Sequence, residues 1–231
     1  MSMFRGNSGT LKLALRRDGK QVSMEVPMKV WDESAVVSRH FVAGQKQLGY
    51  VGIRLFTPDS GNLTRKAVES LASLGLAGCI VDLRNNPGGY LDAMALAGSA
   101  FTDQTLGWKV RRDGTKELIE SPAKPFKAMR IVVLINEGTA SAAEILAAGL
   151  HDSIGAQLVG AKTYGRGQIQ TYVALNDGAG IVIPAASAAS VRGVQFNKAA
   201  GLTPDVLAPS FGNKESGDAA YRRAVELLTH G

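Results

Sequence analysis

The chain has 231 residues, 45% of them hydrophobic, which is enough to bury a sizeable core in one main domain. Its net charge of +6 comes partly from arginine pairs without interleaved aromatic residues, a pattern of solvated faces and not of a nucleic-acid-binding stripe. A single cysteine, Cys79, excludes an internal disulfide and a cysteine-based zinc cluster, and three scattered histidines give no metal-binding pattern. We therefore expect no cofactor, no metal and no nucleic-acid partner.

The first elements predicted along the chain are two strands. The segments Thr10–Arg16 and Gln21–Val26 alternate apolar and polar residues around the turn Asp18-Gly19, which predicts a hairpin. Two strands alone are marginally stable in water, so we expect their partners to be missing or to lie elsewhere in the chain. Next, Pro27–Phe41 is predicted to be a crossover, and Gln47–Phe56 to be a strand pair.

A helix, a strand, a glycine loop and a second helix follow. The apolar spacing of Ser60–Leu74 predicts a helix capped by Ser60 or Asn62. Ala77–Leu83 reads as a buried strand, and Leu91–Phe101 as an apolar helix. Between them, the loop ending in Pro-Gly-Gly at residues 87–89 is either an ordinary turn or a loop whose N–H groups face a ligand.

The middle of the chain places a serine at a strand-to-helix turn. After a polar hairpin at Gly107–Glu120, the apolar run Ile131–Ile135 predicts a buried strand, and Ala142–Leu150 predicts a helix. A serine between strand and helix has its hydroxyl raised at the sheet edge, beside helix N–H groups. Ser141 and Glu144 also fit the S-x-x-E capping box, and the two interpretations are compatible.

The remaining elements complete an α/β pattern. We predict a short strand at residues 157–159, a loop at Gly160–Gly167, and a strand pair formed by Ile169–Ala174 and Ala179–Pro184. A turn at residues 201–205 and an amphipathic helix over Asp218–His230 follow. Strands that alternate with apolar helices indicate a layered α/β domain. No apolar run approaches the roughly 18–20 residues that span a bilayer, and the first residues lack the apolar segment of a signal peptide.

Four separated blocks of this sequence resemble the carboxyl-terminal processing peptidases, the tail-specific serine proteases of family S41. The blocks are GYVGIRLF at Gly49–Phe56, VDLRNNPGG at Val81–Gly89, INEGTASAAEILAAGLHD at Ile135–Asp152 and GAKTYGRGQIQ at Gly160–Gln170. The plant and cyanobacterial members that process a photosystem subunit look most similar. The resemblance implies a ClpP/crotonase-like layered core at 29–231, preceded at 1–28 by the last strands of a PDZ-like domain.

The resemblance also implies a chemistry and a substrate. In this family a serine acts with a lysine base, and the serine corresponds to Ser141. The oxyanion is expected to be held by Ala142 and by Gly88 or Gly89, and the glutamine that orients the lysine corresponds to Gln170. The implied partner is a protein or peptide with an exposed C-terminal tail, and the implied compartment is extracytoplasmic, either periplasm or thylakoid lumen.

One departure from the family pattern concerns the base. Arg166 stands at the lysine position, and a guanidinium keeps its proton at any working pH because its pKa is above about 12. Lys162 lies four residues earlier and is a possible substitute, whereas His151 is expected to face elsewhere near the end of the helix. Two interpretations stay open: a serine peptidase with impaired turnover, or a pseudopeptidase that binds extended C-terminal peptides.

Overall fold

The computed structural model describes residues 9–28, 34–126, 129–176, 179–197, 201–208 and 217–230. Contacts divide the chain into two units, Met1–Ser34 and Ala35–Gly231. In the first unit, β1 (Gly9–Arg17) pairs antiparallel with β2 (Lys20–Met28), which confirms the predicted hairpin. Apolar side chains such as Val22 and Met24 are 42% and 45% exposed, so this hairpin buries no core of its own among the described residues.

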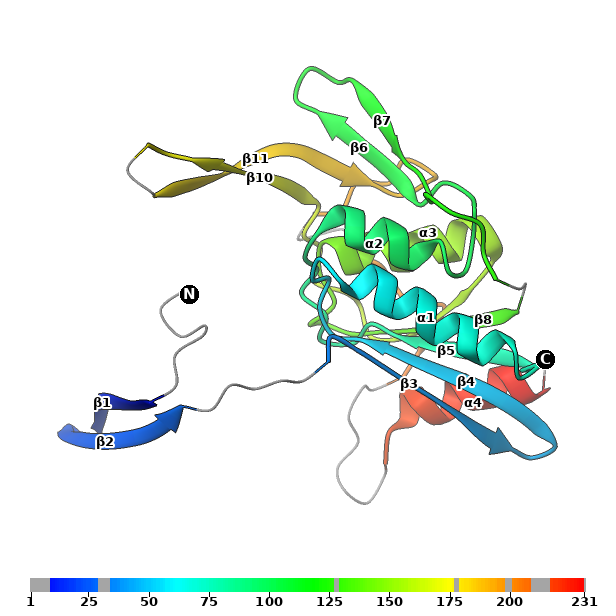
Figure 1. Cartoon of the computed structure of the whole chain (residues 1–231), viewed down its shortest axis with the longest axis horizontal. Coiled ribbons are helices and arrows are strands. Elements are labelled where there is room, and N and C mark those ends of the chain that lie inside the picture. Colours follow the sequence, from blue (N-terminus) through cyan, green and yellow to red (C-terminus); the bar gives the residue numbers. More distant parts are fainter. Residues whose placement is uncertain are drawn as a thin grey trace. The chain divides into compact units, whose positions relative to one another are not determined.

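A six-stranded sheet forms the base of the second unit (Figure 1). Its strands, in spatial order, are β12 (Val206–Leu207), β9 (Gln157–Gly160), β8 (Arg130–Ile135), β5 (Gly78–Asp82), β4 (Lys46–Ile53) and β3 (Val36–Ala43). All neighbouring pairs are parallel except β3 with β4. The carboxyl ends of β4, β5 and β8 therefore meet at one edge of the sheet, where ligand-binding loops of α/β folds commonly gather.

The predictions for β3 and β4 were wrong. Val36–Phe41, predicted within a crossover, belongs to the edge strand β3, and Gln47–Phe56 supplies the single strand β4 instead of a pair. The polar residues of β3 suggested a connection because an edge strand leaves much of its surface in water.

Four helices cover the two faces of this sheet. On one face, α1 (Ser60–Ala72), α2 (Leu91–Gly98) and α3 (Ala142–Ile154) share the larger apolar cluster, and on the other face α4 (Ala219–His230) packs against Ile80, Val132 and Leu134. All four were predicted, although α2 ends earlier and α3 continues further than expected. The predicted cap of α1 was wrong: Asp59 is the N-cap, because Ser60 is already helical.

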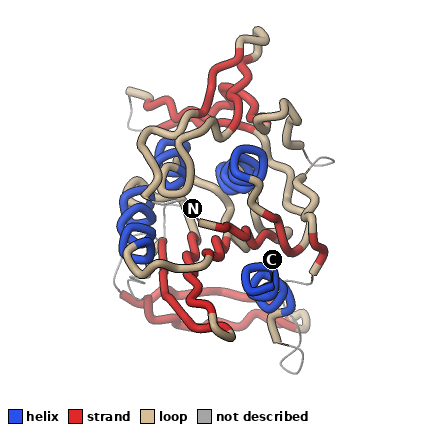
Figure 2. Tube along the Cα trace, turned by 90° about the vertical axis from the view of Figure 1, so that its right-hand side faces the viewer, coloured by secondary structure: helices blue, strands red, loops and turns tan. Residues whose placement is uncertain are grey.

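A second sheet lies above α2 and α3, so these helices lie between two strand layers (Figures 1 and 2). Its strand order is β10 (Gln168–Ala174), β11 (Gly180–Ala189), β6 (Gly107–Arg111) and β7 (Lys116–Ile119), all antiparallel. Both predicted strand pairs are present, but β11 extends to Ala189 and pairs there with β6. The fold class is mixed α/β, as predicted.

A buried ion cluster attaches α4 to the sheet. Asp82, at the end of β5, binds the Arg84 guanidinium (Nη2–Oδ2 2.6 Å) and accepts a hydrogen bond from the Tyr50 hydroxyl (3.0 Å). Arg84 also reaches Asp218, just before α4, at 2.6 Å. The side chains of Arg84 and Asp82 are only 10% and 9% exposed, and burial, together with the Asp82 carboxylate, raises the pKa of Tyr50.

Replacement of Arg84 is expected to destabilise the protein strongly. Arg84→Ala leaves the buried Asp82 carboxylate without its cation, so the free energy of unfolding should fall by about 3–5 kcal/mol in urea titrations. The matched control Arg223→Ala removes an exposed pair with Glu226 and should cost no more than about 1 kcal/mol. Equal losses in the two variants would contradict this account.

Burial should also protect the cysteine. Cys79 lies 1% exposed in β5, and burial raises the pKa of its thiol to about 12. At mildly alkaline pH the thiol therefore stays protonated, and a thiol-alkylating reagent should modify Cys79 in denaturing urea but not in the folded protein. Rapid alkylation of the native chain, followed by mass spectrometry, would contradict the assignment to the core.

Candidate active site

A cleft of about 490 Å³ brings together residues from separate parts of the chain. Its lining includes five residues that the sequence analysis had selected: Gly89, Ser141, Ala142, Arg166 and Gln170. They come from the loop after β5, the start of α3, the loop after β9, and β10. Gly88 and Lys162 are not among the lining residues.

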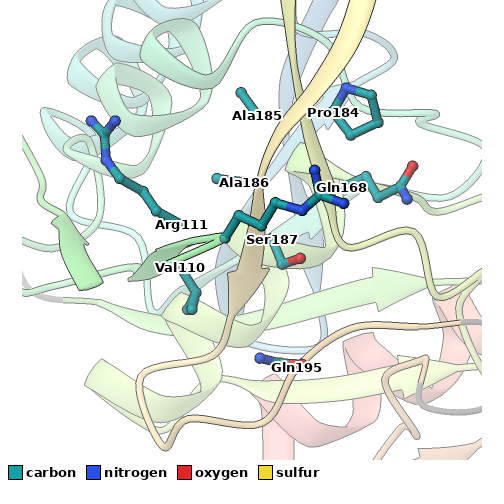
Figure 3. Close-up of a pocket in the computed structure, with 9 residues that line it drawn as sticks. Val110, Arg111, Gln168, Pro184, Ala185, Ala186, Ser187 and Gln195 are labelled. Atoms are coloured by element: carbon teal, nitrogen blue, oxygen red, sulfur yellow. The ribbon is translucent and has the colours of Figure 1, made fainter. Parts of the chain in front are cut away.

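A second groove, of about 500 Å³, crosses the sheet at β11 (Figure 3). Val110, Arg111, Ser187 and Gln195 are among its lining residues. The groove shares Gln168 with the cleft but contains none of the selected site residues. The Arg111 guanidinium is already paired with Glu117, with Nε 2.6 Å from Oε1. The cleft that contains Ser141 is therefore the better candidate for chemistry.

Ser141 has a strained backbone at the mouth of the cleft. Its φ is 57° and its ψ is −124°, a conformation that residues with a Cβ rarely adopt. Ser141 is partly exposed, whereas Ala140 and Ala142 on either side are buried. A strained serine between a buried strand and a helix is the geometry that presents a nucleophilic hydroxyl.

The predicted capping box is also present at this position. Ser141 is the N-cap of α3, and its N–H donates to Oε2 of Glu144 at 3.0 Å. The two interpretations of Ser141, as a helix cap and as an accessible hydroxyl, therefore apply to the same residue.

Glu144 connects the serine turn to the loop that carries Arg166. Its buried carboxylate accepts four hydrogen bonds, two on each oxygen. Oε2 accepts from the N–H groups of Ser141 (3.0 Å) and Arg166 (2.8 Å). Oε1 accepts from the N–H of Gly165 (2.8 Å) and the Thr163 hydroxyl (2.5 Å). This role was not predicted from the sequence, where the S-x-x-E motif was its only local signal.

Thr163 extends this connection to a further loop. Its hydroxyl accepts a hydrogen bond from the Leu202 N–H (2.7 Å), and its own N–H donates to the Leu202 carbonyl (3.0 Å). The backbone around Arg166 is therefore fixed from both sides, and its position does not depend on the side chain at 166.

The Pro-Gly-Gly loop is pressed against Phe56 and Ser141. Phe56 N–H donates to the Gly88 carbonyl (2.9 Å), and Tyr90 N–H donates to the Phe56 carbonyl (2.8 Å). Gly88 and Gly89 have φ values of 103° and 134°, and a Cβ would lie 2.7 Å from Ser141 Cβ or 2.2 Å from the Phe56 oxygen, respectively. Only glycine fits at either position.

Near Ser141, the N–H groups of two lining residues have no hydrogen-bond partner among the residues that the structure describes. They belong to Gly89 and Ala142, whereas the Gly88 N–H donates to Oδ1 of Asn86 at 2.9 Å. Gly89 and Ala142 both line the cleft beside Ser141. Unpaired donors at such a position can bind a negatively charged oxygen.

Buried polar side chains that the sequence analysis missed hold these loops in place. Asn86 Nδ2 donates to the Ile53 carbonyl (2.9 Å), and the Asn86 carbonyl accepts the Ala140 N–H (2.9 Å). Asn136 Oδ1 accepts the Asn85 N–H at 2.8 Å. These bonds join the ends of β4, β5 and β8. Their signal was the position of asparagines directly after buried strands, where polar groups need partners.

The residues near the expected base position differ in their surroundings. The exposed Arg166 side chain lies with Cζ 5.0 Å from the Tyr164 ring centroid, while Gln170 lies on β10 beside a register shift between Ile169 and Gln170. Lys162 is exposed outside the cleft lining. His151 contacts Asp152 (2.9 Å) and Asp205 (3.4 Å) near the far end of α3, which confirms its predicted helix-end position.

The described part of the chain has neither a metal-binding cluster nor a membrane-spanning helix. No group of three or more histidine, cysteine, aspartate or glutamate side chains is arranged there to hold a metal ion. None of the helices described is long and apolar enough to cross a membrane.

Comparison with known proteins gives consistent matches. The model of peptidase family S41 matches residues 47–208. A carboxyl-terminal-processing protease of Synechocystis sp. is 36% identical over 220 residues, which are 90% of this chain and 51% of that protein. The chloroplastic C-terminal processing peptidase of Tetradesmus obliquus is 36% identical over 166 residues, covering 71% of this chain and 36% of the relative. The chain thus spans about half, or less, of the length of these relatives.

The fold is similar to that of a solved family structure. The photosystem II D1 C-terminal processing protease superposes with a TM-score of 0.73 and 27% sequence identity, covering 91% of this chain and 58% of that one. The similarity includes both fold and sequence.

Replacing Glu144 with its neutral isostere tests the role of the carboxylate. In Glu144→Gln, an amide NH₂ replaces one acceptor oxygen and faces N–H donors, so the free energy of unfolding should fall by about 2–5 kcal/mol. The loop at 163–166 should also lose protection in amide hydrogen exchange. The control Glu137→Gln, at an exposed position, should change stability by less than about 0.5 kcal/mol. A Glu144→Gln protein as stable as the control would contradict this role.

Proposed function

Because the chain belongs to peptidase family S41, we propose that it forms a serine endopeptidase-type domain that cleaves proteins near their carboxyl terminus, with Ser141 as the nucleophile. The observation that carries this proposal is the position of Ser141, strained and partly exposed, beside two unpaired N–H groups in one cleft. The names of the relatives support the substrate class, a protein with an exposed C-terminal tail.

The proposed chemistry is acyl transfer. The Ser141 hydroxyl attacks the scissile carbonyl, and the resulting oxyanion accepts hydrogen bonds from the N–H groups of Gly89 and Ala142. We favour Gly89 over Gly88 because the Gly88 N–H already donates to Asn86. Loss of one such donor typically costs about 2.7–4 kcal/mol of transition-state stabilisation. The C–N bond then breaks, the amine leaves with the proton that a general base took from Ser141, and water hydrolyses the acyl-enzyme.

The group that this mechanism lacks is a general base for Ser141. Arg166 has no lone pair with which to accept the serine proton. Glu144 cannot replace it, since both of its oxygens already accept two hydrogen bonds each. Gln170 lines the cleft where it would orient a lysine at 166. We therefore propose that turnover by this chain is slow or absent unless Lys162 moves in as base.

The alternative is a pseudopeptidase that binds extended C-terminal peptides without cutting them. One specific observation favours it besides Arg166. β10 is the edge strand of its sheet, and its residues Gln168, Gln170 and Tyr172 line the cleft. An extended peptide can pair with such an edge by strand addition.

We propose the following domain identities. Residues 1–28 are the last strands of a PDZ-like domain, and 29–231 are the peptidase core, with a ClpP/crotonase-like arrangement of layers. The exposed two-stranded hairpin and the partial coverage of the relatives support the first assignment. We also propose an extracytoplasmic compartment for the whole protein. The name of the Tetradesmus obliquus relative, a chloroplastic peptidase, supports this proposal.

Restoring the lysine tests the proposal. Arg166→Lys should cleave an unstructured protein with an apolar C-terminus at least about 100-fold faster than the chain as given, because it regains a general base. Ser141→Ala in the same background should abolish cleavage, as measured by gel electrophoresis and mass spectrometry of the products. If the chain as given cuts as fast as Arg166→Lys, another base is at work, and Lys162 is the next residue to remove.

A further inference from the structure

Arg166 brings a permanent positive charge to a cleft whose lining residues include no carboxylate. Arg166 is among the residues that line the cleft, and its guanidinium has no ion-pair partner among the described residues. No aspartate or glutamate is among the residues that line this cleft. A guanidinium is a permanent cation, so Arg166 brings to the cleft a positive charge that no lining carboxylate pairs with.

The other polar groups of the cleft are hydrogen-bond donors or can act as donors. The N–H groups of Gly89 and Ala142 are unpaired, and Ser141 adds a hydroxyl. In peptide hydrolysis, such donors stabilise a charge that exists only transiently on one oxygen. Together with a fixed cation, they also fit a ligand with two oxygens and a permanent negative charge.

We propose that this cleft binds the free α-carboxylate at the C-terminus of a peptide. One carboxylate oxygen would accept hydrogen bonds from Gly89 and Ala142, and the other would contact the Arg166 guanidinium. The inference rests on the proposed function because it uses the same cleft, and it names the group that is recognised. Such a carboxylate is what hydrolysis leaves on the acyl side of the cleaved bond, so the chain would retain processed C-termini.

The backbone places Arg166 for this task. Its N–H is fixed at 2.8 Å from Glu144, and its guanidinium lies over Tyr164. Both oxygens of Glu144 accept hydrogen bonds from other donors, and its carboxylate forms no ion pair with the guanidinium among the described residues. A guanidinium donates charge-assisted hydrogen bonds to a carboxylate oxygen, which are shorter and stronger than those between neutral groups.

The lining of the cleft selects a chain end, not an isolated anion. Ile145, Ile169 and Val182 offer apolar surface, and the edge of β10 can pair with the residues that precede the carboxylate. Arg111 in the groove at β11 offers a matched comparison (Figure 3), because its side chain is also exposed but pairs with Glu117.

The test measures binding by fluorescence anisotropy, using the chain as given and three versions of one labelled apolar peptide. The first has a free C-terminal carboxylate, the second is amidated, and the third is amidated with aspartate as its last residue. The free acid should bind about tenfold or more tightly than the amide, as expected for a charge-assisted hydrogen bond. The amidated aspartate peptide should bind close to the level of the amide.

Variants assign the effect to Arg166. Arg166→Met should remove the preference for the free acid, whereas the matched control Arg111→Met should keep it, and thermal melting should confirm that both fold.

Three outcomes would overturn the proposal: equal binding of acid and amide, equal binding of the free acid and the amidated aspartate peptide, or no binding of any peptide. Cleavage by Arg166→Lys is measured separately. If that variant cuts but the chain as given shows no acid preference, this inference alone fails. If that variant does not cut but the preference is present, the proposed function fails and the inference stands.

Discussion

The site depends on one buried carboxylate. Glu144 is removed from water, and burial of a charged carboxylate is costly unless hydrogen bonds compensate it. Here four donors do so, and they come from the serine turn and from the loop at 163–166. Because three of the four are backbone N–H groups, the frame that places residue 166 beside Ser141 does not depend on which side chain residue 166 carries.

The rest of the cleft is built in a similar way, since buried polar side chains fix its backbone and few exposed side chains set its chemistry. The Pro-Gly-Gly loop reaches Ser141 because glycine has no Cβ. The Gly88 N–H donates to Asn86, whereas the Gly89 N–H has no partner among the described residues. The side chain at 166 then decides the outcome. A lysine there would supply a base, whereas Arg166 supplies a fixed cation, and on our proposals this favours retention of a carboxylate over turnover.

The sequence predicted those elements that are determined by residues close together in the chain. Buried strands such as Ile131–Ile135 are continuous apolar runs, and the helix that follows Ser141 begins at a capping box, so both were recognisable. The edge strand β3 was missed because its polar residues resemble a loop. The pairing of β11 with β6 and the four bonds of Glu144 depend on residues far apart in the chain, and no local pattern records which N–H group is left without a partner.

The most direct test of this account is the labelling of Ser141 by a small fluorophosphonate ester, followed by intact-mass measurement and peptide mapping. Such a probe reports the nucleophilicity of the hydroxyl without needing capture of a protein tail. We predict rapid labelling at Ser141 in Arg166→Lys and very slow labelling in the chain as given. Equally rapid labelling of Ser141 in both would contradict the account, because it would show that the hydroxyl is activated by a group other than the residue at 166.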